Sequence, residues 1–335
     1  MNAGKNVIRP LLGKPRWYPD EINWPKGFLA LGIAEYAGVG LGEAAPICGA
    51  EERGRLLSAL EELFDEWISR GMRLQNIDDA IAGCVLLRLA GETGRAEYLE
   101  ACGRIYSFLR GVATDREGAL CYFVGQGNDF VLVDGIGQAS MFLYDYAKAL
   151  GDAEARAFGL RQLELFLHHA IDERSGLPYH GYVLSPGCGW AAHEIRQGII
   201  GWGRGVGWLL LGMSRYAELR EQTLAMADAA HRLQLRDGLW AWQLGATGGP
   251  TDTSGTAMIA YSLDRAALGQ EELVGRAVEG VLASVGDDGR LTGCLDDGRG
   301  ISQHPQNYGH YPWGQGIALA LLSRWAREHR RREAA

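Results

Sequence analysis

Apolar residues recur through much of the chain at the spacing of an α-helix. Between residues 52 and 70, Leu56, Leu60, Leu63 and Trp67 follow the i, i+4, i+7 rule, and charged side chains fill the opposite positions. This pattern is typical of a helix with one face on a core and the other in water. It predicts outer helices over residues 52–70, 95–110, 153–170, 221–234 and 271–284.

A second kind of segment is rich in Gly and Ala and nearly free of charge beyond its first turn. A helix that is apolar on all sides is packed on more than one face, so these segments are expected in the interior. They cover residues 27–38, 78–91, 134–150, 203–220, 254–268 and 314–328.

The two kinds of segment alternate, and the inner ones begin every 50 to 70 residues. A repeat of this kind is typical of closed or solenoid arrays. The simplest architecture is an all-α toroid of helical hairpins, an α/α barrel, whose sixth outer helix comes from a terminal segment that the pattern does not locate. No shift in composition and no Pro- or Ser-rich linker divides the chain, so residues 1–335 are expected to form a single α/α-barrel domain.

Charge and hydropathy exclude two classes of partner. The chain has 41 acidic and 33 basic residues and a net charge of −8, so no general positive field is available to hold a nucleic acid or an anionic membrane. No apolar run approaches the roughly 18–20 residues that a membrane span needs, and the first 20 residues lack the apolar centre of a signal peptide. A cytoplasmic protein is expected, and any anionic ligand must be met by local bases.

Neither a metal nor a nucleotide cofactor is expected. The six cysteines contain no CxxC pair, and His180, Cys188 and His193 match no zinc-ligand spacing. The segment FVLVDGIGQAS lacks the third glycine of a dinucleotide-binding fingerprint, and no alternation of strands and helices surrounds it. The two histidines are therefore free for other roles, and His180 is expected to contact a ligand.

The starts of the inner segments carry most of the residues that can do chemistry. Hairpins wound one way around a ring place all inner N-termini at one rim, so these residues are expected to converge. Glycines let a ligand approach the backbone, and helix N-termini favour anions. Carboxylates, one arginine, hydroxyls and tryptophans at one mouth outline a site for an acidic sugar. The residues are Asp78, Asp79, Asp134, Trp202, Arg204, Trp208, Thr253, Ser254 and Trp313.

Structural roles compete with functional ones for several of these residues. Asp78 and Asp134 have the residue type and the position of helix N-caps. Asp78 and Asp79 diverge by about 100° on a helix, so only one of them faces the pocket, and the sequence leaves open which. Arg204 suits stacking on tryptophan or capping of carbonyls, although an anion-facing role is favoured.

Six short motifs follow one another in a distinctive order and spacing. They are IDDAIAG (77–83), LVDGIGQA (132–139), GLPYHGY (176–182), GWGRGVGW (201–208), DTSGTAMIAYSL (252–263) and PWGQGIALAL (312–321). In these residues the chain resembles the unsaturated glycuronyl hydrolases of glycoside hydrolase families 88 and 105, most closely the unsaturated rhamnogalacturonyl hydrolases. The resemblance covers about residues 75–328.

The resemblance implies an (α/α)6 barrel that acts as a catalytic domain without a metal or other cofactor. It implies a substrate whose nonreducing end is a 4,5-unsaturated uronic acid, left there by a polysaccharide lyase. It also implies that Asp134 is the catalytic acid, with an acid of the 78–79 pair, His180, Arg204 and Trp208 in the pocket.

The residue types suit this chemistry. An enol ether is nucleophilic at C4, and protonation there by Asp134 gives a cation at C5, which water attacks. The resulting hemiketal opens and releases the aglycone, so one proton-delivering carboxyl replaces the usual pair that flanks a glycosidic bond. On this hypothesis Arg204 pairs with the C5 carboxylate and Trp208 stacks on the flattened ring.

Two other functions fit the same residues. A hydrolase of saturated glycosides needs two carboxylates, which Asp134 with Asp78, Asp79 or Asp252 would supply. In a noncatalytic glycan-binding toroid, the tryptophans stack on sugars and Asp134 only caps a helix. The ultraviolet absorbance of the conjugated enol ether separates these functions, because only an unsaturated-uronyl hydrolase erases it.

Overall fold

The computed structural model describes residues 22–40, 46–124, 129–184, 194–246 and 248–334. Within these ranges, eleven α-helices fall into an inner and an outer set. The inner helices are α2 (Trp24–Ala37), α4 (Ile81–Thr93), α6 (Val133–Leu150), α8 (Gly203–Met213), α10 (Thr253–Ala266) and α12 (Pro312–Ala334). The outer helices are α3 (Ala50–Ser69), α5 (Ala96–Gly111), α7 (Ala153–Ala170), α9 (Arg220–His231) and α11 (Glu271–Ala283).

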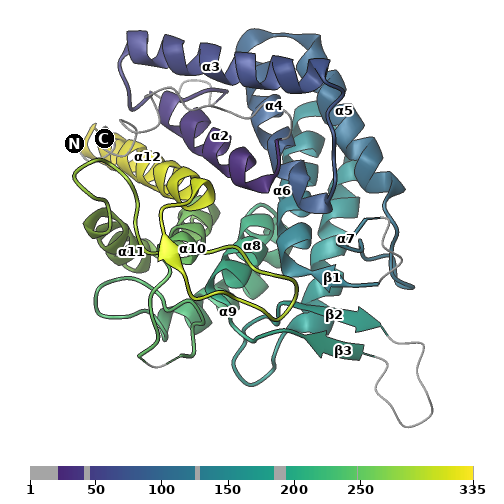
Figure 1. Ribbon diagram of the computed structural model, residues 1–335, viewed down its shortest axis with the longest axis vertical. Helices are drawn as coiled ribbons and strands as arrows, with labels where there is room; N and C mark the ends of the chain where they lie inside the picture. Colours follow the sequence, from purple (N-terminus) through teal and green to yellow (C-terminus); the bar gives the residue numbers. More distant parts are fainter. Residues whose placement is uncertain (1–21, 41–45, 125–128, 185–193, 247, 335) are drawn as a thin grey trace.

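The inner helices form a closed ring (Figure 1). Each inner helix packs against the next one along the chain, and α12 packs against α2 to complete the circle. Each outer helix packs against the inner helix that precedes it. The α/α barrel predicted from the two alternating kinds of segment is therefore confirmed.

Several helix ends differ from the predicted ones. The inner segment predicted over 203–220 ends at Met213, and the chain turns inward so that the Tyr216 hydroxyl donates to the Ser140 carbonyl oxygen at 3.0 Å. Helix α2 begins at Trp24, before the predicted start, because a proline in the first turn lacks only an N–H that would have no partner there. No sixth outer helix lies in the described ranges, and the terminal residues 1–21 lie outside them.

Glycine lets the inner helices approach one another closely. A Cβ atom on Gly32 of α2 would lie 2.2 Å from the carbonyl oxygen of Gly316 on α12. A Cβ atom on Gly137 of α6 would lie 2.0 Å from the carbonyl oxygen of Trp208 on α8. Alanine at these positions would force the helices apart, so the glycine-rich composition of the inner segments is a packing requirement.

Short strands lie beside the N-terminal ends of the inner helices, where the sequence predicted only loops. β1 (Val131–Leu132), β2 (Gly181–Leu184) and β3 (Glu194–Gln197) form an antiparallel sheet, and β4 (Cys294–Leu295) pairs with β5 (Tyr308–Gly309). Leu132 lies opposite Gly181, which brings the nearby Asp134 and His180 together. Strands of this length are too short to show a period of two in the sequence.

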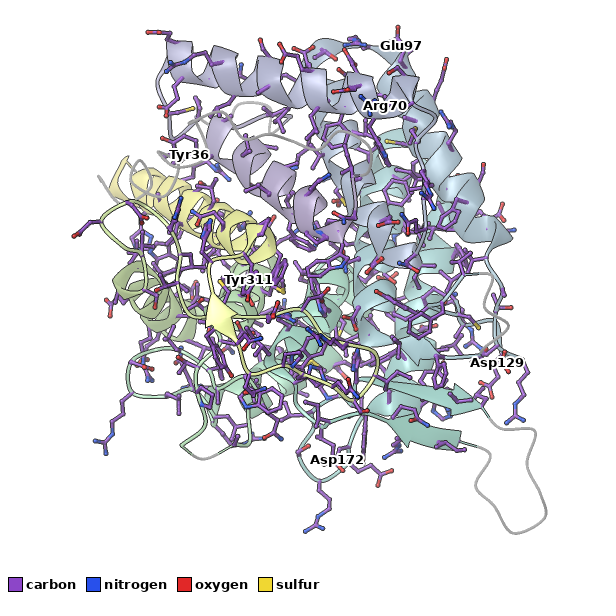
Figure 2. The ribbon with its side chains drawn as sticks, viewed as in Figure 1. Tyr36, Arg70, Glu97, Asp129, Asp172 and Tyr311 are labelled. Carbon is purple, nitrogen blue, oxygen red and sulfur yellow. The ribbon has the colours of Figure 1, made fainter. Side chains whose placement is uncertain are left out.

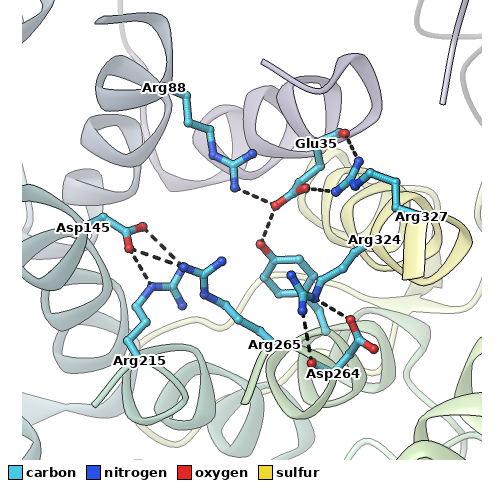
Figure 3. A network of polar contacts seen from close by, with 9 residues as sticks. Glu35, Arg88, Asp145, Arg215, Asp264, Arg265, Arg324 and Arg327 are labelled. Atoms are coloured by element: carbon cyan, nitrogen blue, oxygen red, sulfur yellow. Dashed lines mark hydrogen bonds and ion pairs between the residues drawn. The ribbon is translucent and has the colours of Figure 1, made fainter. Parts of the chain in front are cut away.

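Buried charges close the other end of the barrel, near the C-terminal ends of the inner helices (Figure 3). The Glu35 carboxylate accepts hydrogen bonds from Arg88 at 2.6 Å, from the Tyr261 hydroxyl at 2.9 Å, and from Arg327. Further ion pairs join Asp145 to Arg215 and Arg265, and Asp264 to Arg324.

In the described part of the chain, no helix combines the length and apolar character that crossing a bilayer requires.

Two labelled tyrosines lie at opposite ends of the barrel (Figure 2). Tyr36 lies in the last turn of α2, beside Glu35 at the charged end. Tyr311 directly precedes α12, and its ring stacks on Trp313 with a centroid distance of 4.6 Å. The aromatic residues around Trp313 therefore belong to the N-terminal end of the barrel, together with the short strands.

Candidate active site

A cavity of about 250 Å³ lies among the N-terminal ends of the inner helices. Its walls come from the first turn of α2, from the residues directly before the 3-10 helix η1 (Ile77–Ala80), β2 and α8, from β1 and the segments on either side of it, and from the loop after β4. Aromatic rings and a few polar groups make up the lining, as is typical of small-molecule sites. The lining residues are Trp24, Asn76, Tyr122, Phe123, Leu132, Asp134, His180, Trp202, Asp297, Gly298 and Gly300.

Asp134 and His180 form a hydrogen-bonded pair in this cavity. His180 Nε2 lies 2.9 Å from Asp134 Oδ2, and His180 Nδ1 donates to the Ile301 carbonyl oxygen at 2.7 Å. A carbonyl oxygen only accepts, so Nδ1 carries a hydrogen and Nε2 is left to share a proton with the carboxyl group. One proton therefore lies between Nε2 and Oδ2, whichever of the two atoms holds it.

The electrostatics of His180 favour retention of that proton. Burial by itself disfavours the imidazolium, but the negative charge of Asp134 and the Ile301 carbonyl outweigh burial and raise the pKa of His180 above its ordinary value of 6.5. Asp134 does not cap α6, because the N-cap is Leu132 and no side chain bonds the free N–H groups there. The carboxylate is directed to the histidine instead.

The structure gives the two neighbouring acids different roles. Asp79 Oδ2 accepts hydrogen bonds from the backbone N–H groups of Gln75 at 2.8 Å and Asn76 at 3.1 Å, as part of a capping box. Asp78 Oδ2 accepts a hydrogen bond from the hydroxyl of Tyr122 at 2.6 Å. Tyr122 lines the cavity but neither acid is among the described lining residues, so Asp78 contacts the site only through Tyr122, and a role of this pair in the pocket stays a prediction.

Asp78 is surrounded in a way that disfavours its ionised form. Only 1% of the residue is exposed. Burial raises the pKa of Asp78 well above its ordinary value, and the charges of Asp79 and Asp134 add to this effect, whereas the Tyr122 hydroxyl opposes it. Asp78 thus lies buried behind Tyr122, whereas the carboxyl group of Asp134 lines the cavity.

Arg204 lies behind the cavity wall. Its Nη1 and Nη2 donate to the carbonyl oxygens of Leu295 at 2.5 Å and Asp296 at 2.8 Å, and its guanidinium lies 5.0 Å from the ring of Trp202. The residue is 1% exposed and is not one of the lining residues. A substrate carboxylate would have to compete with these carbonyls, so the expected pairing of Arg204 with an anion stays a prediction.

The predicted tryptophans lie at different depths relative to the cavity. Trp202 lines the cavity, whereas Trp208 and Trp313 lie beneath it and are nearly inaccessible to solvent. Both pack against Trp24, with ring centroids 5.7 Å and 5.0 Å from it. Trp24 itself lines the cavity and was not predicted, because no motif marks residues 1–74. The sequence signal that was available for Trp24 was its place at the start of an inner helix, which it shares with Trp313.

The hydroxyls of Thr253 and Ser254 support the site from outside the cavity lining. Thr253 Oγ1 donates to the Thr292 carbonyl oxygen at 2.7 Å, and Ser254 Oγ donates to Asp252 Oδ1 at 2.6 Å. The same Asp252 oxygen accepts the backbone N–H of Leu295 at 3.0 Å. These contacts fix strand β4 and, with it, the loop that enters the cavity.

The loop after β4 contributes two residues that the motifs did not reveal. Asp297 lines the cavity, and partial burial raises its pKa, an effect that Arg204 opposes and Asp134 reinforces. His304 packs with its ring centroid 4.8 Å from that of Trp202, and burial lowers the pKa of His304 to about 4, so the ring is neutral. The length of the loop 285–313 was the only sequence signal for them.

Neither nitrogen of His180 is free for a metal in this arrangement, because each faces an oxygen atom. The described ranges contain no group of three His, Cys, Asp or Glu side chains that could hold a metal ion. Cys188 and His193, which were weighed as possible ligands with His180, lie outside these ranges.

Known structures share the fold. A glycoside hydrolase of family 105 from C. acetobutylicum is similar with a TM-score of 0.81 and 18% identity, covering 97% of this chain and 99% of that one. The unsaturated glucuronyl hydrolase from Bacillus sp. GL1, responsible for the degradation of glycosaminoglycan, is similar with a TM-score of 0.73 and 18% identity, covering 96% and 94%. At this identity the likeness concerns the fold.

Sequence comparison identifies the family. A curated relative, the 24.9 kDa protein in picA locus of Rhizobium radiobacter, is 34% identical over 139 residues, which are 38% of this chain. The match spans about three fifths, 59%, of that relative's length. The family model for Glycosyl Hydrolase Family 88 matches residues 20–328. The chain therefore belongs to glycosyl hydrolase family 88.

Proposed function

We propose that this chain is an unsaturated glycuronyl hydrolase that acts as a single catalytic domain. It would remove the 4,5-unsaturated uronic acid residue at the nonreducing end of lyase-generated oligosaccharides by hydrating the C4–C5 double bond of that residue. The observation that supports this proposal most strongly is the Asp134–His180 pair, whose two side chains line the cavity and share one proton. Two proteins of similar structure support it, since both are unsaturated glucuronyl hydrolases and one of them is specific for heparin.

The geometry suggests how the proton is used. Asp134 delivers the shared proton to C4 of the enol ether, and positive charge develops at C5 and the ring oxygen. A water molecule adds to C5, and its proton returns to the pair. The C5 hemiketal then opens, and the aglycone leaves from C1. His180 acts as a positioning residue, because it orients the Asp134 carboxyl and stores the proton between turnovers.

The alternative of a saturated-glycoside hydrolase receives less support from the acids considered for it. Such an enzyme needs two carboxyls placed across the glycosidic bond. Asp79 and Asp252 each accept backbone N–H groups, and Asp78 is bonded to Tyr122. A noncatalytic glycan-binding toroid would not need a histidine that is held against Asp134 by a second hydrogen bond to the Ile301 carbonyl oxygen. Of the acids considered for this alternative, Asp134 is the one that lines the cavity, which favours delivery of the proton by Asp134 alone.

A panel of lyase-generated disaccharides tests the proposed function. We expect the protein to erase the ultraviolet absorbance of at least one of them, and the finer proposal is a substrate of the rhamnogalacturonyl type. Failure to erase the absorbance of any disaccharide, while saturated glycosides are cleaved or sugars are bound unchanged, would contradict the proposal.

We expect substitution of His180 to change the pH dependence of turnover. Activity should persist at low pH and fall as the pH rises through the raised pKa of His180, because the shared proton is then lost. In His180→Asn, the basic limb of the pH–rate profile should move to lower pH. His168→Asn, on the exposed face of α7, is the matched control and should keep the original profile. An unmoved basic limb in His180→Asn would show that His180 does not hold the proton.

Arg204→Lys tests whether Arg204 supports the site by holding the loop after β4 in place. Lysine lacks the planar fork that bonds the Leu295 and Asp296 carbonyls together, and a hydrogen bond to a charged group contributes about 1.5–3 kcal/mol. We expect the thermal midpoint and kcat/KM to fall together. A lower kcat/KM for the anionic substrate with an unchanged midpoint would instead favour direct pairing of Arg204 with a substrate carboxylate.

A further inference from the structure

The β4–β5 loop, residues 296–307, forms one wall of the cavity and is tied to the catalytic pair. The carbonyl oxygen of Ile301 accepts the Nδ1–H of His180 at 2.7 Å. Arg204 holds the beginning of the loop through the Asp296 carbonyl at 2.8 Å. The position of Asp297, which lines the cavity and is exposed at its mouth, is therefore set relative to the pair.

The charges around the cavity are unevenly distributed. Asp134 and Asp297 are the two carboxyl groups among the described lining residues, and none of those residues is Arg or Lys. The positive charge near the site lies on the inner side, on His180 and on the buried Arg204. Arg299 is exposed and does not belong to the lining. A substrate thus meets positive charge deep in the site and a carboxylate at the mouth.

A carboxylate in this position discriminates between substituents. Sugar hydroxyls donate hydrogen bonds to it, and hydrogen bonds to an ionised acceptor are stronger than neutral ones. A sulfate group has no hydrogen to donate, and its negative charge would face that of Asp297, with no Arg or Lys among the described lining residues to offset the repulsion. Specificity is commonly obtained by such like-charge repulsion against the wrong ligand.

We propose that Asp297 selects lyase products whose sugar at the mouth of the cavity carries free hydroxyls, and rejects those that carry sulfate there. This inference rests on the proposed function and narrows its substrate class to unsulfated oligosaccharides. Asp297 is a specificity residue in this account. The proton-delivering chemistry stays with Asp134.

The test compares two unsaturated uronyl hexosamine disaccharides that differ only in one sulfate on the hexosamine. kcat/KM is measured for both with the wild type, with Asp297→Asn, and with Asp287→Asn. The last variant removes one negative charge from an exposed turn after α11 and is the matched control. Calorimetric binding of both disaccharides to Asp134→Asn, with and without Asp297→Asn, measures the same preference without turnover.

We expect the wild type to prefer the unsulfated disaccharide, and Asp297→Asn to reduce that preference by about tenfold or more, mainly through better use of the sulfated one. Asp287→Asn should keep the wild-type preference. An unchanged ratio in Asp297→Asn, in turnover and in binding, would overturn the inference while leaving the proposed function intact. If no variant erases the absorbance of either hexosamine disaccharide, the binding ratios decide the role of Asp297, and the proposed function is decided separately by the wider panel of lyase-generated disaccharides.

Discussion

Asp134→Asn should leave the fold intact and lower turnover by about 10²–10⁴-fold, the usual contribution of a positioned general acid. Asparagine has nearly the same shape and its side-chain oxygen still accepts a hydrogen bond from His180, but it cannot deliver a proton to carbon. The loss should therefore appear in kcat, with little change in substrate binding. Initial rates of absorbance loss, together with a thermal melt of the same preparation, measure both effects.

Asp152→Asn provides the control for this substitution. Asp152 is the N-cap of α7, and its Oδ1 accepts the backbone N–H of Ala155 at 2.9 Å. Asparagine caps a helix as well as aspartate does, so this variant should keep both activity and stability. If Asp134→Asn behaved in the same way as Asp152→Asn, Asp134 would have only a structural role and the mechanism would be wrong.

Glu35→Gln should destabilise the protein by about 3–5 kcal/mol, the typical effect of breaking a buried ion pair on one side. The Glu35 side chain is 2% exposed and is bonded to Arg88 and Arg327, whose side chains are only 12% and 7% exposed. Without the carboxylate, both guanidinium groups stay buried with their charge uncompensated. Urea unfolding of the variant and the wild type gives the difference in free energy.

The control for Glu35→Gln is Glu66→Gln, which removes an ion pair with Arg70 on the surface of α3. Those side chains are 43% and 44% exposed, so the change should stay within about 0.5 kcal/mol. The arginines hold the pKa of Glu35 well below its ordinary value of 4.5, despite burial. The stabilisation that ionised Glu35 contributes is therefore complete above pH 4.5 and is lost as the pH falls from there towards the lowered pKa of Glu35. Equal effects of the two substitutions would contradict the assigned role of the buried charges.

The barrel could be predicted because its signal is repeated. Amphipathic and apolar segments alternate, and each alone is weak evidence, but the alternation leaves few other architectures. The short strands could not be predicted, since two to four residues show no period. Their register, with Leu132 opposite Gly181, is nevertheless what brings Asp134 to His180. The contact between these residues thus depends on tertiary structure that local patterns do not contain.

Only part of the candidate site could be predicted from residues at helix starts. Asp134 and Trp202 were found in this way and line the cavity. Asp297 and His304 were missed because they lie in an irregular loop whose path is set by distant hydrogen bonds, such as that from Arg204 to the Asp296 carbonyl. The hydrogen bond from Tyr122 to Asp78 likewise joins residues from two distant segments.

The central claim is that the enzyme hydrates an enol ether instead of displacing a leaving group at C1. The most direct test records the ultraviolet absorbance of an unsaturated uronyl disaccharide and the release of its aglycone in the same reaction. Our account predicts that absorbance is lost in step with aglycone release, one double bond for each bond cleaved. Release of the aglycone with the absorbance of the double bond retained would contradict it.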